Sequence, residues 1–175
     1  MQEVLAARID RPPIEEKALL QTGAVIGRGL PFSLLRQVME QPDKELYQRL
    51  SHLQRGEFIY DQTRFPESSY TFKHVLTQEV AYNSLLPERR RTLHERAAHA
   101  VEELFHDRLA EHCSELAHHY RWSGNPTKAV LYLQRAGQQA VQRSAYAEAI
   151  GHVSTALELL KTLPDTGERR QQEPA

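Results

Sequence analysis

The sequence predicts a mainly α-helical protein, with a small β-hairpin in its first half and only helices in its second half. Apolar side chains recur every three or four residues through most of the chain, which is the period of an amphipathic helix. Only residues 57–61 and 69–73 alternate apolar and polar side chains in the way that strands do. From residue 88 onward no strand pattern occurs, so this half is expected to be all helical.

The first half begins with helices. Residues 14–39 contain two short helical patterns, separated by the breaker segment Gly-Arg-Gly-Leu-Pro at 27–31. A third helix is expected after Asp43, whose carboxylate is placed to cap its first turn, and Gly56 is expected to end it.

The predicted hairpin follows these three helices, and a further helix at residues 74–86 closes the unit. Three helices followed by a hairpin are typical of a winged-helix domain, which we place at residues 1–86, with Pro87 at its boundary. The aromatic residues that alternate with polar neighbours in the hairpin are Phe58, Tyr60, Tyr70 and Phe72.

The second half, residues 88–163, is predicted to be a series of helices that each bury one stripe of apolar or small residues. Small residues in these stripes allow helices to approach closely. The four stripes are Leu93, Ala97, Val101 and Leu104; Leu109, Cys113, Leu116 and Tyr120; Ala129, Leu133, Ala136 and Ala140; and Ile150, Val153, Leu157 and Leu160.

Part of this region resembles a tetratricopeptide unit, through the residues Leu116, Ala117, Tyr120, Gly124, Ala129, Leu133 and Ala136. The helix from Ala147 repeats the alanine spacing of this unit, but it follows the previous helix at a sequence distance shorter than a full repeat. We therefore expect an irregular array in which the middle helix packs against both neighbours.

Residues 164–175 have the pattern of the truncated start of a further repeat helix, and both ends of the chain resemble interior positions of a longer protein.

Composition limits the possible partners and location. With 22 basic and 23 acidic residues the net charge is −1, so no global charge attracts nucleic acid or an anionic membrane. The single cysteine, Cys113, excludes an internal disulfide and is expected to be a small core residue. No run of apolar residues is long enough to span a membrane, and no signal-peptide pattern occurs, so a cytoplasmic protein without membrane association is expected.

The segment 70–82 is the most informative for function, because an alternating strand runs directly into a helical pattern with Lys73 and His74 at the junction. The backbone N–H groups of a first helical turn have no intrahelical partner and carry the positive end of the helix dipole, so an anion is favoured there. Two plainer interpretations remain open. His74 caps the helix or packs at the bend, and Lys73 is a solvated lysine on an exposed strand.

Several segments together resemble the C-terminal half of bacterial STAND-class predicted ATPases, which are often fused to class III adenylate or guanylate cyclase domains. In that family an AAA-like nucleotide-binding module precedes a winged helix and tetratricopeptide-like repeats. The resemblance implies that the winged helix folds over the nucleotide. It also implies that His74 matches the histidine of an MHD-type motif that touches the ADP phosphate, with Lys73 a weaker candidate. The segments that carry the resemblance are residues 4–30, 50–60, 70–86, 89–98, 116–124 and 163–173.

The chain has no GxxxxGK[ST] phosphate loop and no aspartate pair in a recognisable cyclase context. We therefore expect no enzymatic activity and no cofactor in this segment, while the implied parent would use ATP or ADP with magnesium. The expected role is regulatory: the winged helix docks on the absent ATPase core, and the repeats bind a protein partner.

Two alternatives come from other classes of function. A winged helix can bind DNA, and the helix after Asp43 offers Lys44, Arg49 and Arg55, although the net charge of the chain does not favour nucleic acid. The repeats could instead form a passive scaffold that binds partners without any switch. The Arg89–Arg91 run is expected to be a solvated helix start or an ion-pairing surface toward Glu95 and Glu102.

The nine histidines do not form a recognisable metal motif. His112 and His119 could share a helix face, but two ligands without a third make a weak zinc site, and no HExxH occurs. No GxSxG motif supports a hydrolase triad. Helix-surface histidines are therefore the expected interpretation.

Overall fold

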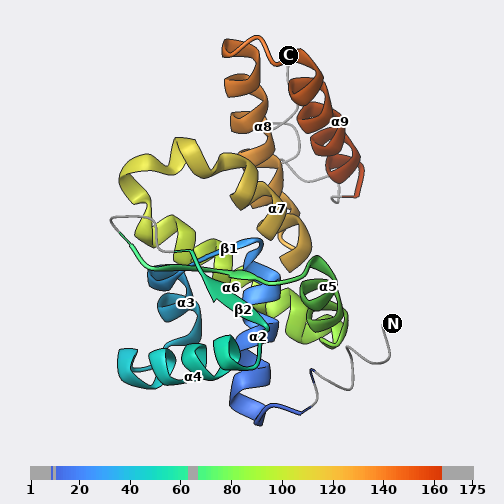
Figure 1. Ribbon diagram of the computed structural model, residues 1–175. Coiled ribbons are helices and arrows are strands. Elements are labelled where there is room, and N and C mark those ends of the chain that lie inside the picture. Colours follow the sequence, from blue (N-terminus) through green and yellow to red (C-terminus); the bar gives the residue numbers. More distant parts are fainter. Residues whose placement is uncertain (1–8, 10, 63–66, 163–175) are drawn as a thin grey trace. The chain divides into compact units, whose positions relative to one another are not determined.

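The computed structural model describes residues 9, 11–62 and 67–162, and it is mainly helical, as predicted (Figure 1). The chain divides into two compact units, residues 1–100 and 101–175. This division falls inside helix α6 (Pro87–Leu104), whereas the sequence places the domain boundary at Pro87, the first residue of α6. The predicted further helix at 164–175 lies outside the described residues.

The first unit contains the predicted helices in the predicted order: α2 (Ile14–Ile26), α3 (Phe32–Met39), α4 (Asp43–Arg55) and α5 (Val75–Asn83). Helix α2 is central, because it packs against α3, α4 and α5. The apolar spacing predicted for α4 is confirmed. Leucines of this unit that are at most 2% exposed include Leu19, Leu20, Leu30, Leu34, Leu35, Leu46, Leu50 and Leu53.

Helix α4 ends at Gly56 as predicted, but its first turn differs from the prediction. Asp43 is the first residue of the helix and caps nothing, because the extended residue Pro42 occupies the N-cap position. Gly56 ends the helix with a right-handed backbone, and the left-handed residue is Glu57, with φ 59°. The reason for a glycine at 56 is steric, since a Cβ there would lie 2.9 Å from the ring of Phe58.

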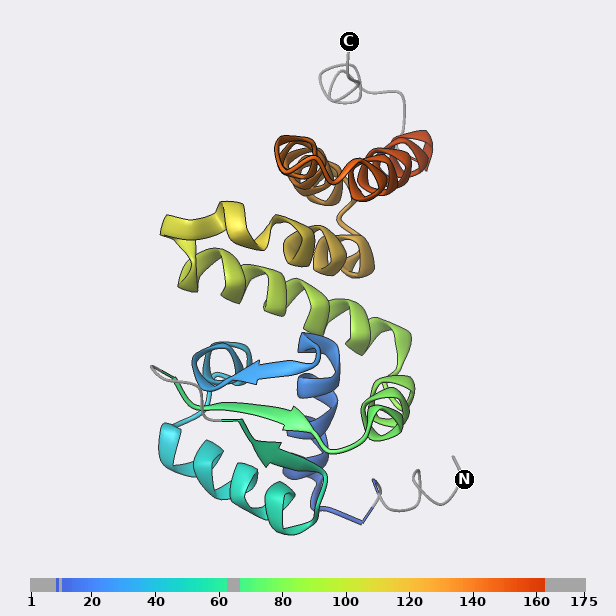
Figure 2. The ribbon, with the colours of Figure 1, turned by 45° about the horizontal axis from the view of Figure 1, so that its top comes forward.

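The predicted hairpin is confirmed as β2 (Ile59–Asp61) and β3 (Ser69–Phe72), which pair antiparallel. The sequence did not predict β1 (Gly29–Pro31), which pairs antiparallel with the other edge of β3. The sheet order is therefore β1-β3-β2 (Figure 2). The breaker segment between the first two helices is thus a short edge strand, and it brings Arg28 and Gly29 beside the hairpin.

The register of the sheet decides which side chains face the core. Leu30 and Tyr70 are paired and both buried, whereas Gly29, Thr71 and Tyr60 lie opposite one another on the other face. Tyr60 is 45% exposed, so its ring does not continue the buried aromatic pattern that the sequence suggests. Ile59 takes the inward position on β2 instead, paired with Phe72.

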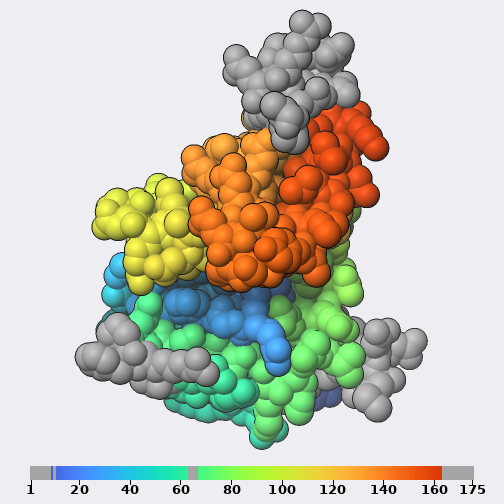
Figure 3. Space-filling model, turned by 90° about the horizontal axis from the view of Figure 1, so that it is seen from above, coloured from blue at the N-terminus to red at the C-terminus, as the bar shows by residue number. Residues whose placement is uncertain are grey.

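The second unit contains the 3₁₀ segment η1 (His106–His112) and the helices α7 (Cys113–Ser123), α8 (Pro126–Gln142) and α9 (Tyr146–Thr162). Helix α8 packs against both α7 and α9, as predicted, and α8 and α9 adjoin as orange and red surfaces in Figure 3. Gly124 forms the expected turn in a left-handed conformation, with φ 84°. The Asn125 side chain then caps α8 by accepting a hydrogen bond from the Lys128 backbone N–H at 3.1 Å.

The buried face of α9 differs from the prediction. Ile150, Val153 and Leu157 are 67%, 42% and 42% exposed, although the spacing predicts a packing stripe. Leu160, the last residue of the stripe, is buried as predicted, and the other buried residues of α9 are the small Ala149 and Ala156. The interface between α8 and α9 is built from small residues, and a Cβ on Gly137 of α8 would lie 3.5 Å from Val153. The backbones approach closely there, and Val153 lies at this contact although it is 42% exposed.

Candidate functional site

The first unit has a cavity of about 320 Å³ on the outer face of its sheet, next to the start of α5. Its size is at the low end of pockets that hold small ligands. Two basic side chains contribute to a lining that is otherwise mostly polar. The lining residues are Arg28, Gly29, Tyr60, Gln62, Thr71, Phe72, Lys73, Val75 and Gln78.

Lys73, one of the two residues singled out by the sequence, lines this cavity. Its ammonium group lies 2.8 Å from the Glu57 carboxylate, and both side chains are largely exposed. An ion pair in such a position contributes little to stability and exchanges readily with solvent. Lys73 can therefore contact an anion in the cavity by giving up its weak surface ion pair with Glu57.

His74, the other residue singled out by the sequence, does not line the cavity. It occupies the N-cap position of α5 with an extended backbone, φ −136° and ψ 136°, and its carbonyl accepts hydrogen bonds from Thr77 and Gln78. Its side chain is exposed and makes no capping hydrogen bond. The strand-to-helix junction is thus as predicted, and His74 caps α5 through its backbone and not through its side chain.

Arg28 is the basic residue of the cavity that sequence reasoning missed. It immediately precedes β1, and its backbone carbonyl accepts a 2.8 Å hydrogen bond from the hydroxyl of the largely buried Thr71. Among the residues that the structure describes, the Arg28 guanidinium has no ion-pair partner. Its position could not be predicted, because a three-residue strand containing glycine and proline carries no periodic signal.

Apolar side chains are exposed beside this cavity. Val75 is 57% exposed and Leu76 is 37% exposed, both in the first turn of α5. The residues that α5 buries are the smaller Thr77 and Ala81. An exposed apolar pair next to basic groups is a surface that another protein domain can cover.

The face of α4 that a DNA-binding winged helix would use is partly occupied by contacts within the unit. The Arg49 guanidinium bonds to Gln41, lies 3.3 Å from Glu15 and is only 15% exposed. His52 Nδ1 lies 2.7 Å from the Glu16 carboxylate. These contacts tie Arg49, one of the three basic candidates for DNA contact, and the nearby His52 to neighbouring parts of the fold.

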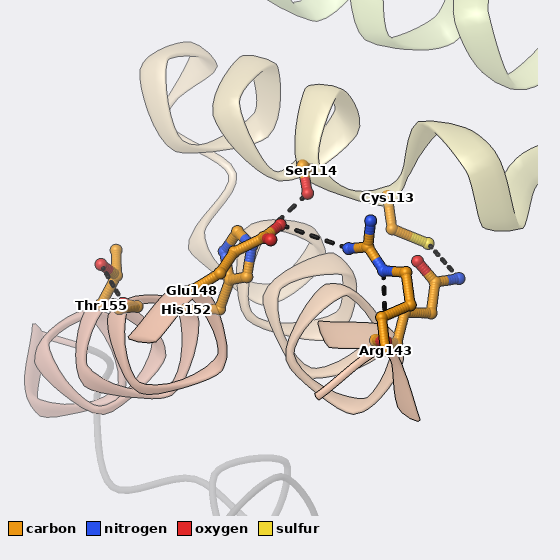
Figure 4. Close-up of polar contacts among 8 residues, drawn as sticks. Cys113, Ser114, Arg143, Glu148, His152 and Thr155 are labelled. Carbon is orange, nitrogen blue, oxygen red and sulfur yellow. Dashed lines mark hydrogen bonds and ion pairs between the residues drawn. The ribbon is translucent and has the colours of Figure 1, made fainter. Parts of the chain in front are cut away.

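The second unit has its own groove of about 320 Å³. It is open and runs between α7 and α9, with Leu133 of α8 contributing to its lining. Figure 4 shows the polar side chains that α7 and α9 direct toward each other, including Ser114, Glu148 and His152. The sequence pattern predicted the helices but not this groove.

A largely buried polar cluster also lies within the second unit. The Glu102 carboxylate accepts hydrogen bonds from Tyr132 at 2.6 Å and from Lys128 at 3.0 Å, and Lys128 also donates to the Tyr120 hydroxyl at 2.8 Å. Burial by itself raises the pKa of the Glu102 carboxyl, but the hydrogen bonds from the two tyrosines and Lys128 outweigh it, so this pKa lies below its usual value. The prediction that Glu102 is an ion-pair partner of the Arg89–Arg91 run is therefore wrong.

The arginine run itself is only partly solvated. Arg90 stacks over the Tyr82 ring at 4.3 Å and donates hydrogen bonds to the backbone carbonyls of Tyr82 and Leu85. Its neighbours Arg89 and Arg91 are exposed, as predicted. Arg90 thus donates to backbone carbonyls at and just beyond the end of α5, where a helix leaves its last carbonyls without intrahelical donors.

No three histidine, cysteine, aspartate or glutamate side chains within residues 9, 11–62 and 67–162 are grouped as metal ligands would be. None of the helices in this described part of the chain has the length and apolar character that crossing a bilayer requires.

Comparisons with known proteins add little to this geometry. No protein-family model matches the chain, and no solved structure matches it significantly. A protein described as "Uncharacterized protein R02095" from Rhizobium meliloti (strain 1021) is 28% identical to the chain over 144 residues. The match covers 82% of this chain but only 14% of that protein, so the chain corresponds to a small part of a much longer relative.

Proposed function

We propose that the chain is a regulatory and interaction segment of a nucleotide-switched signalling ATPase of the STAND class. In this proposal the first unit is a winged helix that docks on the nucleotide-binding core of the parent protein, and the second unit binds a protein partner through its helical repeats. Neither unit catalyses a reaction. The similarity to part of a much longer protein is consistent with such a role.

The observation that carries the proposal is the cavity on the outer face of the sheet. Arg28 and Lys73 supply positive charge, and the start of α5 supplies backbone N–H groups beside them. These are the groups that bind phosphoryl oxygens in proteins. The exposed Val75 and Leu76 next to the cavity provide the apolar surface that a docked core would cover.

His74 has a defined part in this proposal. Its exposed side chain stands at the N-cap of α5, from where it can reach a phosphate held between the docked core and the first helical turn. Arg28 and Lys73 then neutralise the same phosphate from the cavity side. Release of the partner domain or of the nucleotide would break these contacts together.

The test is a titration of the chain with pyrophosphate, followed by amide NMR. We expect shifts at Gly29, Val75 and Leu76, and weak binding on the order of 1 mM, as for an open site with one docking surface uncovered. The variant Arg28→Ala should lose this binding, while Arg55→Ala, which removes an exposed charge on α4, should retain it. Equal binding by both variants would rule out the cavity as a phosphoryl site.

A switch also requires that partner binding and phosphate binding affect each other, because only a ligand with different affinities for two states can shift them. The affinity of the second unit for a partner should therefore differ with and without saturating pyrophosphate or the nucleotide-bound core. Equal affinities would instead indicate a passive scaffold.

A further inference from the structure

The groove of the second unit has two polar walls with the same spacing. Helix α7 contributes Ser114, His118 and Arg121, and helix α9 contributes Glu148, His152 and Thr155. Residues separated by four and three positions lie on one helix face, so each set forms a continuous row along the groove. Between the rows, the lining is small or apolar: Ala117, Leu133 and Gly151.

The negative charges of this region are already paired. Glu148 lies 3.4 Å from the Arg143 guanidinium and 3.5 Å from His152 Nε2 (Figure 4). Glu115, close to the groove on α7, lies 2.8 Å from His112 Nδ1. Each of these carboxylates therefore already has a basic or histidine neighbour within the second unit.

The positive charge of Arg121 is not paired in this way. Its side chain is exposed and has no ion-pair partner among the residues described. Arg121 is close enough to His118 that its charge adds to burial in lowering the pKa of that imidazole, against an opposing effect of Glu115. A basic group and a histidine thus share one wall of the groove with no carboxylate between them.

We propose that this groove binds an acidic segment of a protein partner, with a partner carboxylate paired to the Arg121 guanidinium. His118 supplies a second hydrogen-bond donor to the same carboxylate, and the small floor around Ala117 and Gly151 accepts the backbone of the segment. Charge complementarity favours this occupant over a basic or neutral one. The inference specifies the partner class for the repeat-binding role proposed above, and so it rests on that role.

The chain carries its own probe for the test. Trp122 is its single tryptophan, is 48% exposed, and lies beside His118 with ring centroids 6.5 Å apart. Its fluorescence can be followed while the chain is titrated with three short peptides of equal length, in which alanine alternates with glutamate, glutamine or lysine. We expect saturable binding of the glutamate peptide alone.

Three variants locate the binding. Arg121→Gln should weaken the glutamate peptide about tenfold, as loss of a charge-assisted pair predicts. Gly151→Leu fills the groove without changing charge and should abolish binding. Arg89→Gln removes the same charge from an exposed position outside the groove and should have no effect; circular dichroism of each variant confirms that its helices are intact.

The possible outcomes separate this inference from the broader function. If the glutamate and glutamine peptides bind equally and Arg121→Gln changes nothing, the acidic preference is overturned while partner binding in the groove stands. If no peptide binds, or if binding survives Gly151→Leu, the groove assignment is overturned. Pyrophosphate binding in the first unit is measured independently and is not affected by either result.

Discussion

The hydroxyl of Tyr132 donates a 2.6 Å hydrogen bond to the carboxylate of Glu102, which links α8 to the last turn of α6. The same carboxylate lies 3.0 Å from Lys128, and the rings of Tyr132 and Tyr120 stack with centroids 5.7 Å apart. The cluster is largely buried, so each member depends on the others for its hydrogen bonds.

Removing the Tyr132 hydroxyl should destabilise the chain. The variant Tyr132→Phe leaves the Glu102 carboxylate with one donor fewer, and we expect a loss of about 1–2 kcal/mol in the free energy of unfolding. Urea unfolding followed by the fluorescence of Trp122 measures this loss. The control is Tyr146→Phe, because Tyr146 is 61% exposed and its hydroxyl should contribute little. Equal stability of the two variants would contradict the structural role of the cluster.

The cluster should also give the chain a specific sensitivity to acid. The pKa of Glu102 is lower in the folded state than its ordinary value of 4.5, so the stabilisation is fully present above that value and is lost as pH falls through the folded pKa. Glu102→Gln should therefore lose less stability than the wild type between about pH 7 and about pH 3. Glu158→Gln, which alters an exposed carboxylate of α9, should follow the wild type. A Glu102→Gln profile parallel to the wild type would exclude Glu102 as the source of the effect.

Two glycines of the second unit should respond to alanine in opposite directions. Gly124 has φ 84°, where a Cβ is strained, so Gly124→Ala should cost about 1 kcal/mol. Gly151 lies inside α9 with open space around its missing Cβ, so Gly151→Ala should stabilise the chain by up to about 1 kcal/mol. Thermal unfolding of both variants measures the difference. A destabilised Gly151→Ala would show that α9 needs its glycine for another reason.

The helices and the hairpin could be predicted because each is encoded locally. Leu46, Leu50 and Leu53 carry the helical period of α4, and Tyr70 and Phe72 carry the strand period of β3. The strand β1 could not be predicted in this way, because its three residues become a strand only by pairing with β3 across a long sequence separation. The same holds for the candidate anion site. Lys73 could be predicted from the strand-to-helix pattern, but Arg28 lies beside it only because β1 pairs with β3.

Side-chain burial was harder to predict where small residues decide the packing. In α9 the hydrophobic period selects Ile150, Val153, Leu157 and Leu160, but apart from Leu160 the residues that the helix buries are the small Ala149 and Ala156. The position of large apolar side chains predicts the buried face of a helix only when the helix axes lie at their usual separation. The polar pairs, such as Glu102 with Lys128, depend on tertiary contacts that no sequence period encodes.

Arg90 and Arg91 are adjacent arginines with different predicted contributions. Arg90→Met keeps an apolar stem against Tyr82 but removes the donors to the Tyr82 and Leu85 carbonyls, so we expect a loss of about 1 kcal/mol. Arg91→Met changes an exposed side chain and should be nearly neutral. Urea unfolding of the two variants makes the comparison. If both behave alike, the whole run is a solvated helix start after all.

The last prediction concerns His118 and its neighbour Trp122. Burial lowers the pKa of His118 below its ordinary value of 6.5, the positive charge of Arg121 lowers it further, and Glu115 partly opposes them. The other titratable groups that line the groove with it are Glu148 and His152 of α9, and the lining from α8 is the apolar Leu133. His118 should therefore be neutral at physiological pH and gain its proton only in more acidic solution.

Trp122 fluorescence should report this proton, because a protonated imidazole quenches a nearby indole more strongly than a neutral one. We expect quenching with a midpoint below 6.5 as pH falls, and loss of this transition in His118→Gln. Arg121→Gln should move the midpoint upward, since it removes a charge that disfavours the imidazolium. A bound acidic peptide should raise the midpoint as well, because its carboxylate stabilises the charged form; the peptide should then bind more tightly at low pH by the same linkage. A midpoint that stays fixed in both cases would place His118 away from the bound carboxylate.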